Sequence, residues 1–345
     1  MSAVAFREPP GTESAERSTP ESAFGSVIGE SLAIRAAIAL ACKVAAHPRV
    51  PVLIQGETGT GKELFSRGIH YGGPNSADPF VAINCAAIPE ALLESELFGH
   101  EQGSFTNAVS RKLGLLEVAA SGTVFLDEVT ELPLKLQAKL LRALVSNRIR
   151  RVGGLLEHAI SCRIISAGNS NLAAAVAAGR FREDLYYRLN VFRLDLPPLR
   201  GRDGDIELLA RHFLATSCRE KGLPVKHISP ETEALLRLHA WPGNVRELKN
   251  AIERAVVLNE SDVLLPVHLT LQSRVTISAE SAVEEGPLAG SIPVPTTGLS
   301  LADAEARLIG LTLRLTGGNH SRAARLLEIS RPTLLRKIRI YGLEP

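Results

Sequence analysis

A glycine-rich run ending in a lysine has the residue types needed to bind phosphate. The run comprises Gly56, Glu57, Thr58, Gly59, Thr60, Gly61, Lys62 and Glu63. It follows an apolar segment and precedes a segment expected to be helical, which is the setting of a phosphate-binding loop. Glycines let backbone N–H groups turn toward phosphate oxygens, and the helix N-terminus adds partial positive charge. Lys62 supplies a full charge, but Glu63 stands where the general pattern has a Ser or Thr ligand for magnesium.

Two adjacent carboxylates could complete such a site. Asp127 and Glu128 follow the apolar residues 124–126, which read as a buried strand. Strand ends are where α/β sheets place ligands. We expect Asp127 to hold Mg²⁺ and Glu128 to polarise a water for in-line attack on a γ-phosphate. Together with the glycine-rich loop, this pair predicts hydrolysis of ATP with Mg²⁺ as cofactor.

Two groups of arginines could act on the same phosphates. Residues 179–189 contain three arginines, and a guanidinium beside a γ-phosphate favours its transfer. Arg246 falls in the first turn of a helix expected after Pro242 and Gly243, where a cation opposes the helix dipole. A bound anion is one reason for that placement.

The elements that must position these residues indicate an α/β fold. Residues 52–54, 81–83, 124–126 and 163–165 read as buried strands between amphipathic helices, which predicts a parallel sheet. Leu132, Leu136, Leu140 and Leu144 would line one helix face. We predict a disordered leader at 1–25, an α/β core at 26–200, a helical domain at 201–272, a Gly/Pro-rich linker at 273–298 and an all-α domain at 299–345.

The last 47 residues indicate a DNA-binding helix-turn-helix. They carry eight Lys or Arg against four acidic residues. Asn319 and Ser330 are placed to cap two short helices joined by a tight turn, with Leu334, Ile338 and Tyr341 facing inward. The second helix is basic at its N-terminal end, as in a recognition helix. The candidate DNA-binding residues are Asn319, Ser321, Arg322, Arg331, Thr333, Arg336 and Lys337.

Composition excludes several other classes of protein. Hydrophobic residues make up 45% of the 345, so most of the chain should fold. The four cysteines have spacings that fit no zinc site. The N-terminus does not read as a signal peptide, and the longest uncharged apolar stretch is far too short to span a bilayer. We therefore expect a cytoplasmic protein without membrane contact.

Taken together, these motifs resemble those of the bacterial enhancer-binding proteins, the AAA+ activators of sigma-54 RNA polymerase. The resemblance covers about residues 27–266 and 301–343, and the family's phosphate loop also has a glutamate at the position of Glu63. It implies an AAA+ α/β P-loop NTPase core with a helical lid, followed by a Fis-like helix-turn-helix domain. The family's GAFTGA loop, which contacts sigma-54, matches Gly103, Ser104, Phe105, Thr106, Asn107 and Ala108. Ser104 and Asn107 are departures from that pattern.

The resemblance also implies roles and partners. Asn84 would be a polar switch touching Glu128, while Arg182 and Arg188 would act in trans on a neighbour's ATP. Arg246 would be the sensor II arginine and Asn169 part of sensor I, after a glycine that replaces the usual threonine. The implied partners are sigma-54 RNA polymerase, upstream enhancer double-stranded DNA, and further copies in a ring, expected to be hexameric, with dimeric DNA-binding domains. Because only a short leader precedes the core, we expect no N-terminal sensory domain, and control in trans by a regulatory protein or by expression level.

Two other functions are alternatives to sigma-54 activation. The first is an AAA+ DNA-binding regulator that acts on sigma-70 promoters without contacting sigma-54, and the altered loop is its only support. The second is an unfoldase or replication motor, which predicts pore-loop aromatics and does not need the C-terminal helix-turn-helix.

Overall fold

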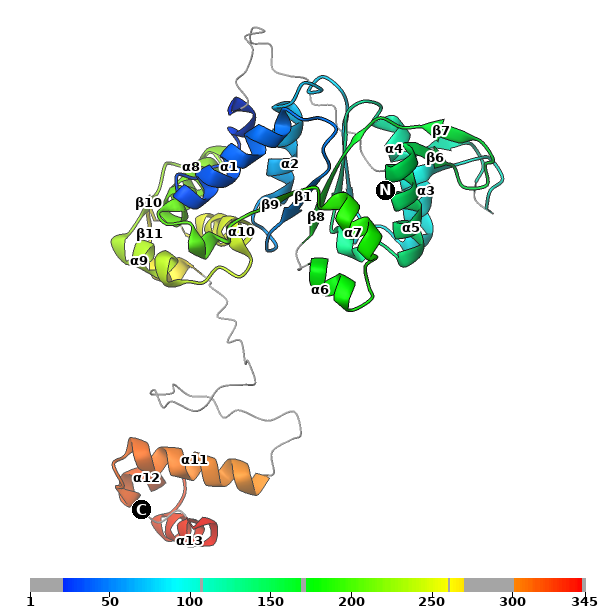
Figure 1. Cartoon of the computed structure of the whole chain (residues 1–345). Helices are drawn as coiled ribbons and strands as arrows, with labels where there is room; N and C mark the ends of the chain where they lie inside the picture. Colours follow the sequence, from blue (N-terminus) through cyan, green and yellow to red (C-terminus); the bar gives the residue numbers. More distant parts are fainter. Residues whose placement is uncertain (1–20, 106–107, 169–171, 260, 270–300, 343–345) are drawn as a thin grey trace. The chain divides into compact units, whose positions relative to one another are not determined.

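The computed structural model describes residues 21–105, 108–168, 172–259, 261–269 and 301–342. By its contacts the chain divides into two compact units, Met1–Ser273 and Arg274–Pro345 (Figure 1). The first unit holds a sheet with helices and a helical lid, and the second is helical. Among the described residues, no helix combines the length and apolar character needed to cross a membrane.

A five-stranded sheet forms the centre of the first unit. Its order is β2 (Phe80–Asn84), β5 (Thr123–Asp127), β8 (Arg163–Gly168), β1 (Val52–Gln55) and β9 (Phe192–Asp195), and all pairings are parallel. The predicted α/β class is confirmed, and four of these strands lie where the apolar runs placed them. The fifth, β9, was not predicted, because its charged residues alternate with apolar ones at the edge of the sheet.

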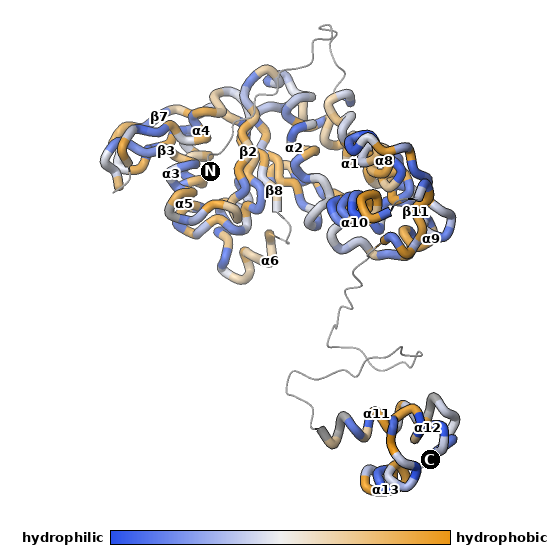
Figure 2. Tube along the Cα trace, turned by 180° about the vertical axis from the view of Figure 1, so that it is seen from behind, coloured by the Kyte–Doolittle hydropathy of each residue, from blue (hydrophilic) through white to orange (hydrophobic). Residues whose placement is uncertain are grey.

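Helices cover both faces of the sheet and bury its apolar residues. Alternate strand residues face opposite sides. On one side, Val52 and Ile54 pack with α1 (Leu32–Ala45) and α2 (Lys62–Tyr71). On the other, Leu53 packs in a cluster with α3 (Glu90–Phe98), α4 (Leu115–Val118), α5 (Leu134–Ser146), α6 (Leu172–Ala177) and α7 (Glu183–Leu189). Leu136, Leu140 and Leu144 of α5 are buried, as predicted, and Leu132 is buried just before the helix begins. Figure 2 shows β2 as predominantly hydrophobic.

Two small antiparallel pairs extend from the sheet. In the first, β3 (Gly99–His100) pairs with β4 (Lys112–Leu113), so the two ends of the segment between them are held side by side. The second joins β6 (Arg148–Arg150) to β7 (Glu157–Ala159). A bridge between His100 and Val152 brings the two pairs together. A short η2 (Val129–Glu131) links β5 toward α5.

The lid consists mainly of three helices around a buried tryptophan. They are α8 (Asp205–Glu220), α9 (Pro230–Leu238) and α10 (Asn244–Leu258), with Trp241 in their core. The expected helical domain also contains a short parallel pair, β10 (His227–Ile228) and β11 (Val263–Leu264). Two 3-10 turns, η3 (Leu199–Gly201) and η4 (Pro266–His268), lie at its two ends.

A buried aspartate fastens the lid to the chain before α1. Asp205 accepts hydrogen bonds from the Ser31 N–H (3.0 Å), the Ser31 hydroxyl (2.9 Å) and Arg202 Nε (2.8 Å). Arg202 also donates to the Ile28 carbonyl at 2.7 Å. Burial alone would raise the pKa of Asp205, but the hydrogen bonds outweigh it and hold the pKa below its ordinary value. Breaking such a buried pair typically costs about 3–5 kcal/mol.

The end of the expected leader is part of the core. Residues Ser22–Phe24 form η1, and the buried Phe24 ring lies 5.8 Å from the Phe65 ring. A Cβ added at Gly68 would lie 2.4 Å from the Phe24 ring, so the glycine admits this aromatic. The prediction of disorder for residues 1–25 is therefore wrong for its last residues. The polar composition of the segment hid the anchoring side chain of Phe24.

The described residues of the second unit, 301–342, form a compact set of three helices. They are α11 (Leu301–Leu315), α12 (His320–Leu326) and α13 (Arg331–Tyr341), around Ile309, Ala323, Ala324, Leu334 and Ile338. Both predicted caps are confirmed, because Asn319 accepts from the Arg322 N–H (3.1 Å) and Ser330 from the Thr333 N–H (3.3 Å). Glu328, in the turn between α12 and α13, has φ +53°. The expected linker, 273–298, lies outside the described residues.

Candidate functional site

The phosphate loop connects β1 to α2 at the carboxyl end of the sheet. Gly59 and Gly61 have φ of +81° and +101°, in the region that favours glycine. The buried Lys62 begins α2, and its Nζ donates to the carbonyls of Gly56 (2.9 Å) and Glu57 (3.2 Å). Burial lowers the pKa of Lys62, and the nearby carboxylates of Glu128 and Asp127 act against that shift. The predicted lysine and carboxylates therefore share one site.

The carboxylate pair stands at the end of β5, beside the end of β2. Asn84 is the register partner of Asp127, and its Nδ2 donates to Asp127 Oδ2 at 3.4 Å. The Asn84 Oδ1 accepts from the N–H groups of Ala86 and Ala87. The Asn84 amide thus orients the first carboxylate, and its expected contact with Glu128 stays a prediction. Glu128 has φ +53°, and its N–H donates to Asp127 Oδ1 at 3.1 Å.

The lid reaches the phosphate loop through residues that sequence reasoning missed. The buried Asn244 donates from Nδ2 to the Thr58 carbonyl (3.0 Å) and Glu57 Oε2 (3.1 Å). Arg200 forms two hydrogen bonds to the Glu57 carboxylate, at 2.8 and 2.6 Å. Arg246 then follows in the first turn of α10. A Cβ added at Gly59 would lie 3.1 Å from the Arg246 Cβ, so the expected arginine is next to the loop.

Two other predicted residues of the phosphate loop make contacts within their own segment. Glu63 is exposed and pairs with Arg67 one turn later (2.9 Å). The Thr60 hydroxyl donates to the Glu57 carbonyl at 2.9 Å. Asn169 lies outside the described residues.

The two arginines expected to act in trans are exposed on the surface around α7. Arg182 caps the helix and pairs with Asp184 at 2.7 Å. Arg188 donates to the Leu144 carbonyl near the end of α5, at 2.7 Å. The internal contacts fix both side chains on an accessible face of the core.

The loop between β3 and β4 carries the segment that resembles GAFTGA. The Gly103 N–H donates to the Ala108 carbonyl (2.9 Å), which closes the loop; Thr106 and Asn107 lie outside the described residues. Phe105 is 38% exposed, and its ring lies 5.0 Å from the His100 ring. The Ser104 hydroxyl oxygen is buried without a hydrogen-bond partner among the described residues. The aromatic is therefore partly displayed and partly packed on the base of its loop.

Arg151 fixes that base. It donates to Glu101 at 2.8 Å and to Glu117 at 2.9 and 2.7 Å. Glu101 precedes the loop and Glu117 belongs to α4 after it, so one buried guanidinium joins both ends.

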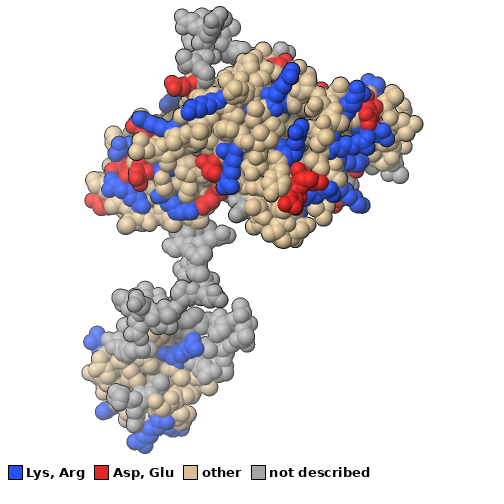
Figure 3. All heavy atoms as spheres, viewed as in Figure 1, with Lys and Arg blue, Asp and Glu red and all other residues tan. Residues whose placement is uncertain are grey.

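The four cations predicted to contact DNA differ in how exposed they are. Arg322, Arg331 and Arg336 are exposed, as expected. Lys337, expected to stay outside, is instead partly buried in an ion pair with Glu305 of α11 (2.5 Å). The Thr333 hydroxyl bonds to Ser330 at 2.7 Å, so it serves the cap. On the face shown in Figure 3, the described side chains of this unit include blue cations and no red acid.

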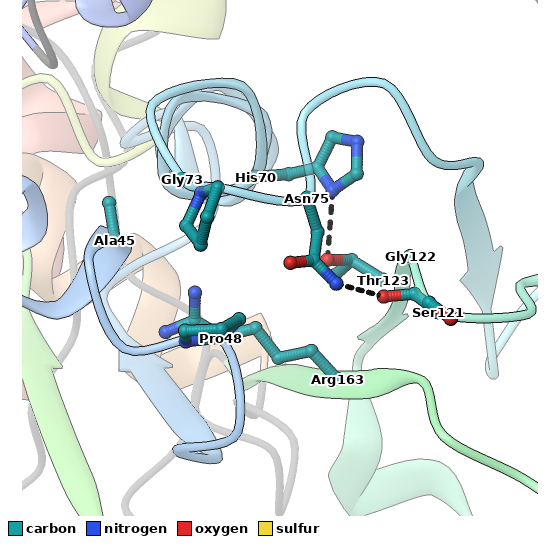
Figure 4. Close-up of a pocket in the computed structure, with 10 residues that line it drawn as sticks. Ala45, Pro48, His70, Gly73, Asn75, Ser121, Gly122, Thr123 and Arg163 are labelled. Carbon is teal, nitrogen blue, oxygen red and sulfur yellow. Dashed lines mark hydrogen bonds between the residues drawn. The ribbon is translucent and has the colours of Figure 1, made fainter.

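A separate small pocket lies at the other end of the strands. Figure 4 shows His70, Asn75, Thr123 and Arg163 lining it, with Thr123 and Arg163 beginning β5 and β8. Arg163 donates to the carbonyls of Val44 (2.9 Å) and Val50 (3.2 Å), and burial lowers its pKa to about 10. Because strands β5 and β8 separate this pocket from Asp127, it is distinct from the nucleotide site.

A phosphate loop after β1, a carboxylate pair ending β5 and a helical lid against the loop define an AAA+ P-loop NTPase fold. Comparison with known families agrees with this. Residues 27–195 match the sigma-54 interaction domain, 200–285 the AAA+ ATPase lid domain, and 300–341 the Fis family of bacterial regulatory proteins. The chain belongs to the family of sigma-54-dependent AAA+ transcription regulators.

The chain is similar to several transcription regulators over most of its length. It is 47% identical to the regulatory protein AtoC of Escherichia coli over 85% of its own length and 63% of AtoC. It is 41% identical to the regulator NtrC of Escherichia coli, over 92% of this chain and 70% of NtrC. The chain thus spans less than two thirds of AtoC. A crystal structure of NtrX from Brucella abortus in complex with ATP superposes with TM-score 0.69 at 33% identity, covering 92% of this chain and 69% of NtrX.

Proposed function

We propose that the protein is an ATP-dependent activator of sigma-54 RNA polymerase that binds enhancer DNA and remodels the closed promoter complex. The observation that carries this proposal is the joining, in one compact unit, of the phosphate loop and the β5 carboxylate pair with the Phe105 loop of a sigma-54 interaction domain. The family match favours this function over regulation of sigma-70 promoters. Such work on polymerase and DNA would take place in the cytoplasm.

The residues of the site divide the chemistry of hydrolysis. Lys62 would neutralise phosphate charge, and the Glu128 carboxylate would take a proton from the attacking water. Asp127, oriented by Asn84, offers the oxygen ligands that Mg²⁺ prefers, and Mg²⁺ would neutralise charge on the phosphates. The ATP complex of NtrX supports nucleotide binding here.

The exposed arginines support assembly into a ring, which we propose to be a hexamer. Arg182 and Arg188 lie on the accessible face around α7, where a neighbouring copy could receive them. A guanidinium supplied by one subunit would stabilise the transferred phosphoryl group in the next.

The second unit would hold the protein on enhancer DNA as a dimer. Arg322, Arg331 and Arg336 are among the exposed cations on α12 and α13. Binding upstream raises the local concentration of the ATPase near the promoter.

The experiment that tests this function measures ATP turnover and transcription from a sigma-54 promoter in the same preparations. Phe105→Ala and Thr106→Ala should keep ATPase activity and lose open-complex formation, because a displayed loop contacts the partner and not the phosphates. Val109→Ala, at a neighbouring position that is 82% exposed, is the matched control and should retain both activities. If the unchanged protein drives no sigma-54 transcription with ATPase intact and its enhancer present, the sigma-70 alternative replaces this proposal.

A further inference from the structure

Three successive residues of the phosphate loop are held from the side of the lid. Arg200 and Asn244 bind the Glu57 carboxylate, Asn244 binds the Thr58 carbonyl, and the Val245 N–H donates to the Gly59 carbonyl at 3.0 Å. These contacts come from η3 and from the start of α10, far away in sequence. The lid therefore forms hydrogen bonds with backbone carbonyls of the loop as well as with the Glu57 side chain.

Holding these carbonyls fixes the direction of the N–H groups. In a trans peptide the C=O and the following N–H point to opposite sides, and the described chain has no cis peptide. With the Thr58 carbonyl bonded to the lid, the Gly59 N–H is turned away from the lid, while the Thr60 N–H donates within the loop to the Glu57 carbonyl at 3.4 Å. A phosphate loop works through its N–H groups, so the lid contacts act on the binding groups themselves.

Asn244 suits this position through both its backbone conformation and its side-chain amide. It is fully buried with φ +51°, a conformation that asparagine tolerates better than most residues. Its Oδ1 accepts from the Leu199 N–H (2.7 Å) while Nδ2 donates to the loop. Aspartate would keep the acceptor but lose the donor.

Gly59 leaves no room for a side chain between the loop and the lid. A Cβ there would lie 2.2 Å from the Gly243 carbonyl oxygen, as well as against Arg246. The lid could not reach the loop over a side chain at this position. The glycine thus serves the contact with the lid as well as the loop's own turn.

We propose that Asn244 and Arg200 are positioning residues through which the lid pre-orders the phosphate loop for nucleotide. This rests on the proposed nucleotide site and adds that affinity depends on side chains behind the loop. The exposed Glu57–Arg200 pair contributes little as a charge interaction alone. Arg200 instead holds the Glu57 carboxylate where Asn244 Nδ2 can donate to it.

The test is titration of the full-length protein with a fluorescent ATP analogue, with thermal unfolding and steady-state turnover alongside. Arg200→Ala should weaken nucleotide binding by roughly 5-fold, the effect of losing about one net hydrogen bond. Its unfolding temperature should not change, because the side chain is 48% exposed. The loss should appear in KM more than in kcat. Arg142→Ala, which removes a similar exposed pair with Glu157, is the matched control and should bind normally.

A donor–acceptor exchange separates positioning from simple packing. Asn244→Asp should weaken binding by roughly 10-fold or more, because a carboxylate cannot donate to Thr58 and repels Glu57. Adding Glu57→Gln restores a donor opposite the new acceptor and should recover part of the affinity. Lowering the pH should also improve binding by the single Asn244→Asp variant, since a proton between the two carboxylates replaces the lost donor.

The outcomes distinguish this inference from the function on which it rests. Normal nucleotide affinity in Arg200→Ala and Glu57→Ala would overturn the positioning role. If Asn244→Asp fails to fold, these two variants decide the matter. Failure of the unchanged protein to bind nucleotide would instead overturn the proposed function.

Discussion

At the scale of single residues, the end of β5 combines two carboxylates with a strained backbone. Glu128 adopts φ +53°, which costs a non-glycine residue roughly 1–2 kcal/mol. Such strain persists where surrounding structure enforces it, often at functional sites. Here Asp127 is held by Asn84 and by the Glu128 N–H, so the two carboxylates have separate environments. That separation suits one carboxylate for a metal and the other for a proton.

Replacing Glu128 should separate nucleotide binding from hydrolysis. Glu128→Gln should bind ATP with nearly normal affinity and hydrolyse it about 10²–10⁴-fold more slowly, since the amide cannot accept the proton. Lys62→Ala is the comparison, and it should lose binding itself because a charge facing the phosphates is gone. Binding and turnover are measured on the same samples. Turnover by Glu128→Gln at the normal rate would show that the base has been misassigned.

The residues predicted from sequence are those whose role depends on near neighbours in the chain. Lys62 follows its own glycines, and Asp127 ends its own strand, so spacing alone identifies them. Asn244 and Arg200 gave no such signal, because the loop residues they bind are more than a hundred positions away. The predicted turn before Arg246 rested on Pro242 and Gly243, and nothing near Asn244 in the sequence singled it out. Only the packing of the lid against the loop shows what its amide does.

At the scale of elements, the helix-turn-helix shows which features can be predicted from residues close together in the chain. Asn319 and Ser330 cap α12 and α13 because their side chains accept N–H bonds within their own segments. The ion pair of Lys337 with Glu305 could not be predicted in this way, since it joins α13 to α11. Strand β9 and the two- and three-residue strands were missed for a similar reason: such short segments become strands only through their partners.

The division of cations in the second unit predicts different effects on DNA binding. Arg331→Ala and Arg336→Ala should weaken binding to the enhancer by about 1–3 kcal/mol and relax sequence choice, if either reaches a base edge. Arg322→Ala should weaken binding to all sequences and flatten the salt dependence, as loss of a phosphate contact does. Lys337→Ala should have the smallest effect, because Glu305 already engages this lysine.

The measurement is affinity for specific and unrelated duplexes over a range of salt, with ATPase activity as a control that should barely change. Equal, sequence-independent losses for all four variants would contradict a reading helix.

At the scale of the whole molecule, the proposed ring makes activity a property shared between copies. Arg182→Ala or Arg188→Ala should reduce turnover while leaving nucleotide binding largely intact, because neither side chain belongs to the phosphate loop. Mixing an arginine variant with Lys62→Ala should restore part of the turnover, since the two defects then fall at different subunit interfaces. Turnover is followed across mixing ratios. Absence of recovery in rings shown to exchange subunits would argue against arginines acting in trans.

The strand order has a consequence for how the chain can fold. Strand β1 lies between β8 and β9, so Val52 pairs with Ile165 on one side and Phe192 on the other. Both partners of Val52 lie more than a hundred residues further along the chain, and closing a loop of that length makes these pairings slow to form. During synthesis the apolar β1 must wait without its strand partners until β8 and then β9 have left the ribosome. Until then it is an aggregation hazard that chaperones would have to shield, and the phosphate loop attached to it cannot take its final form.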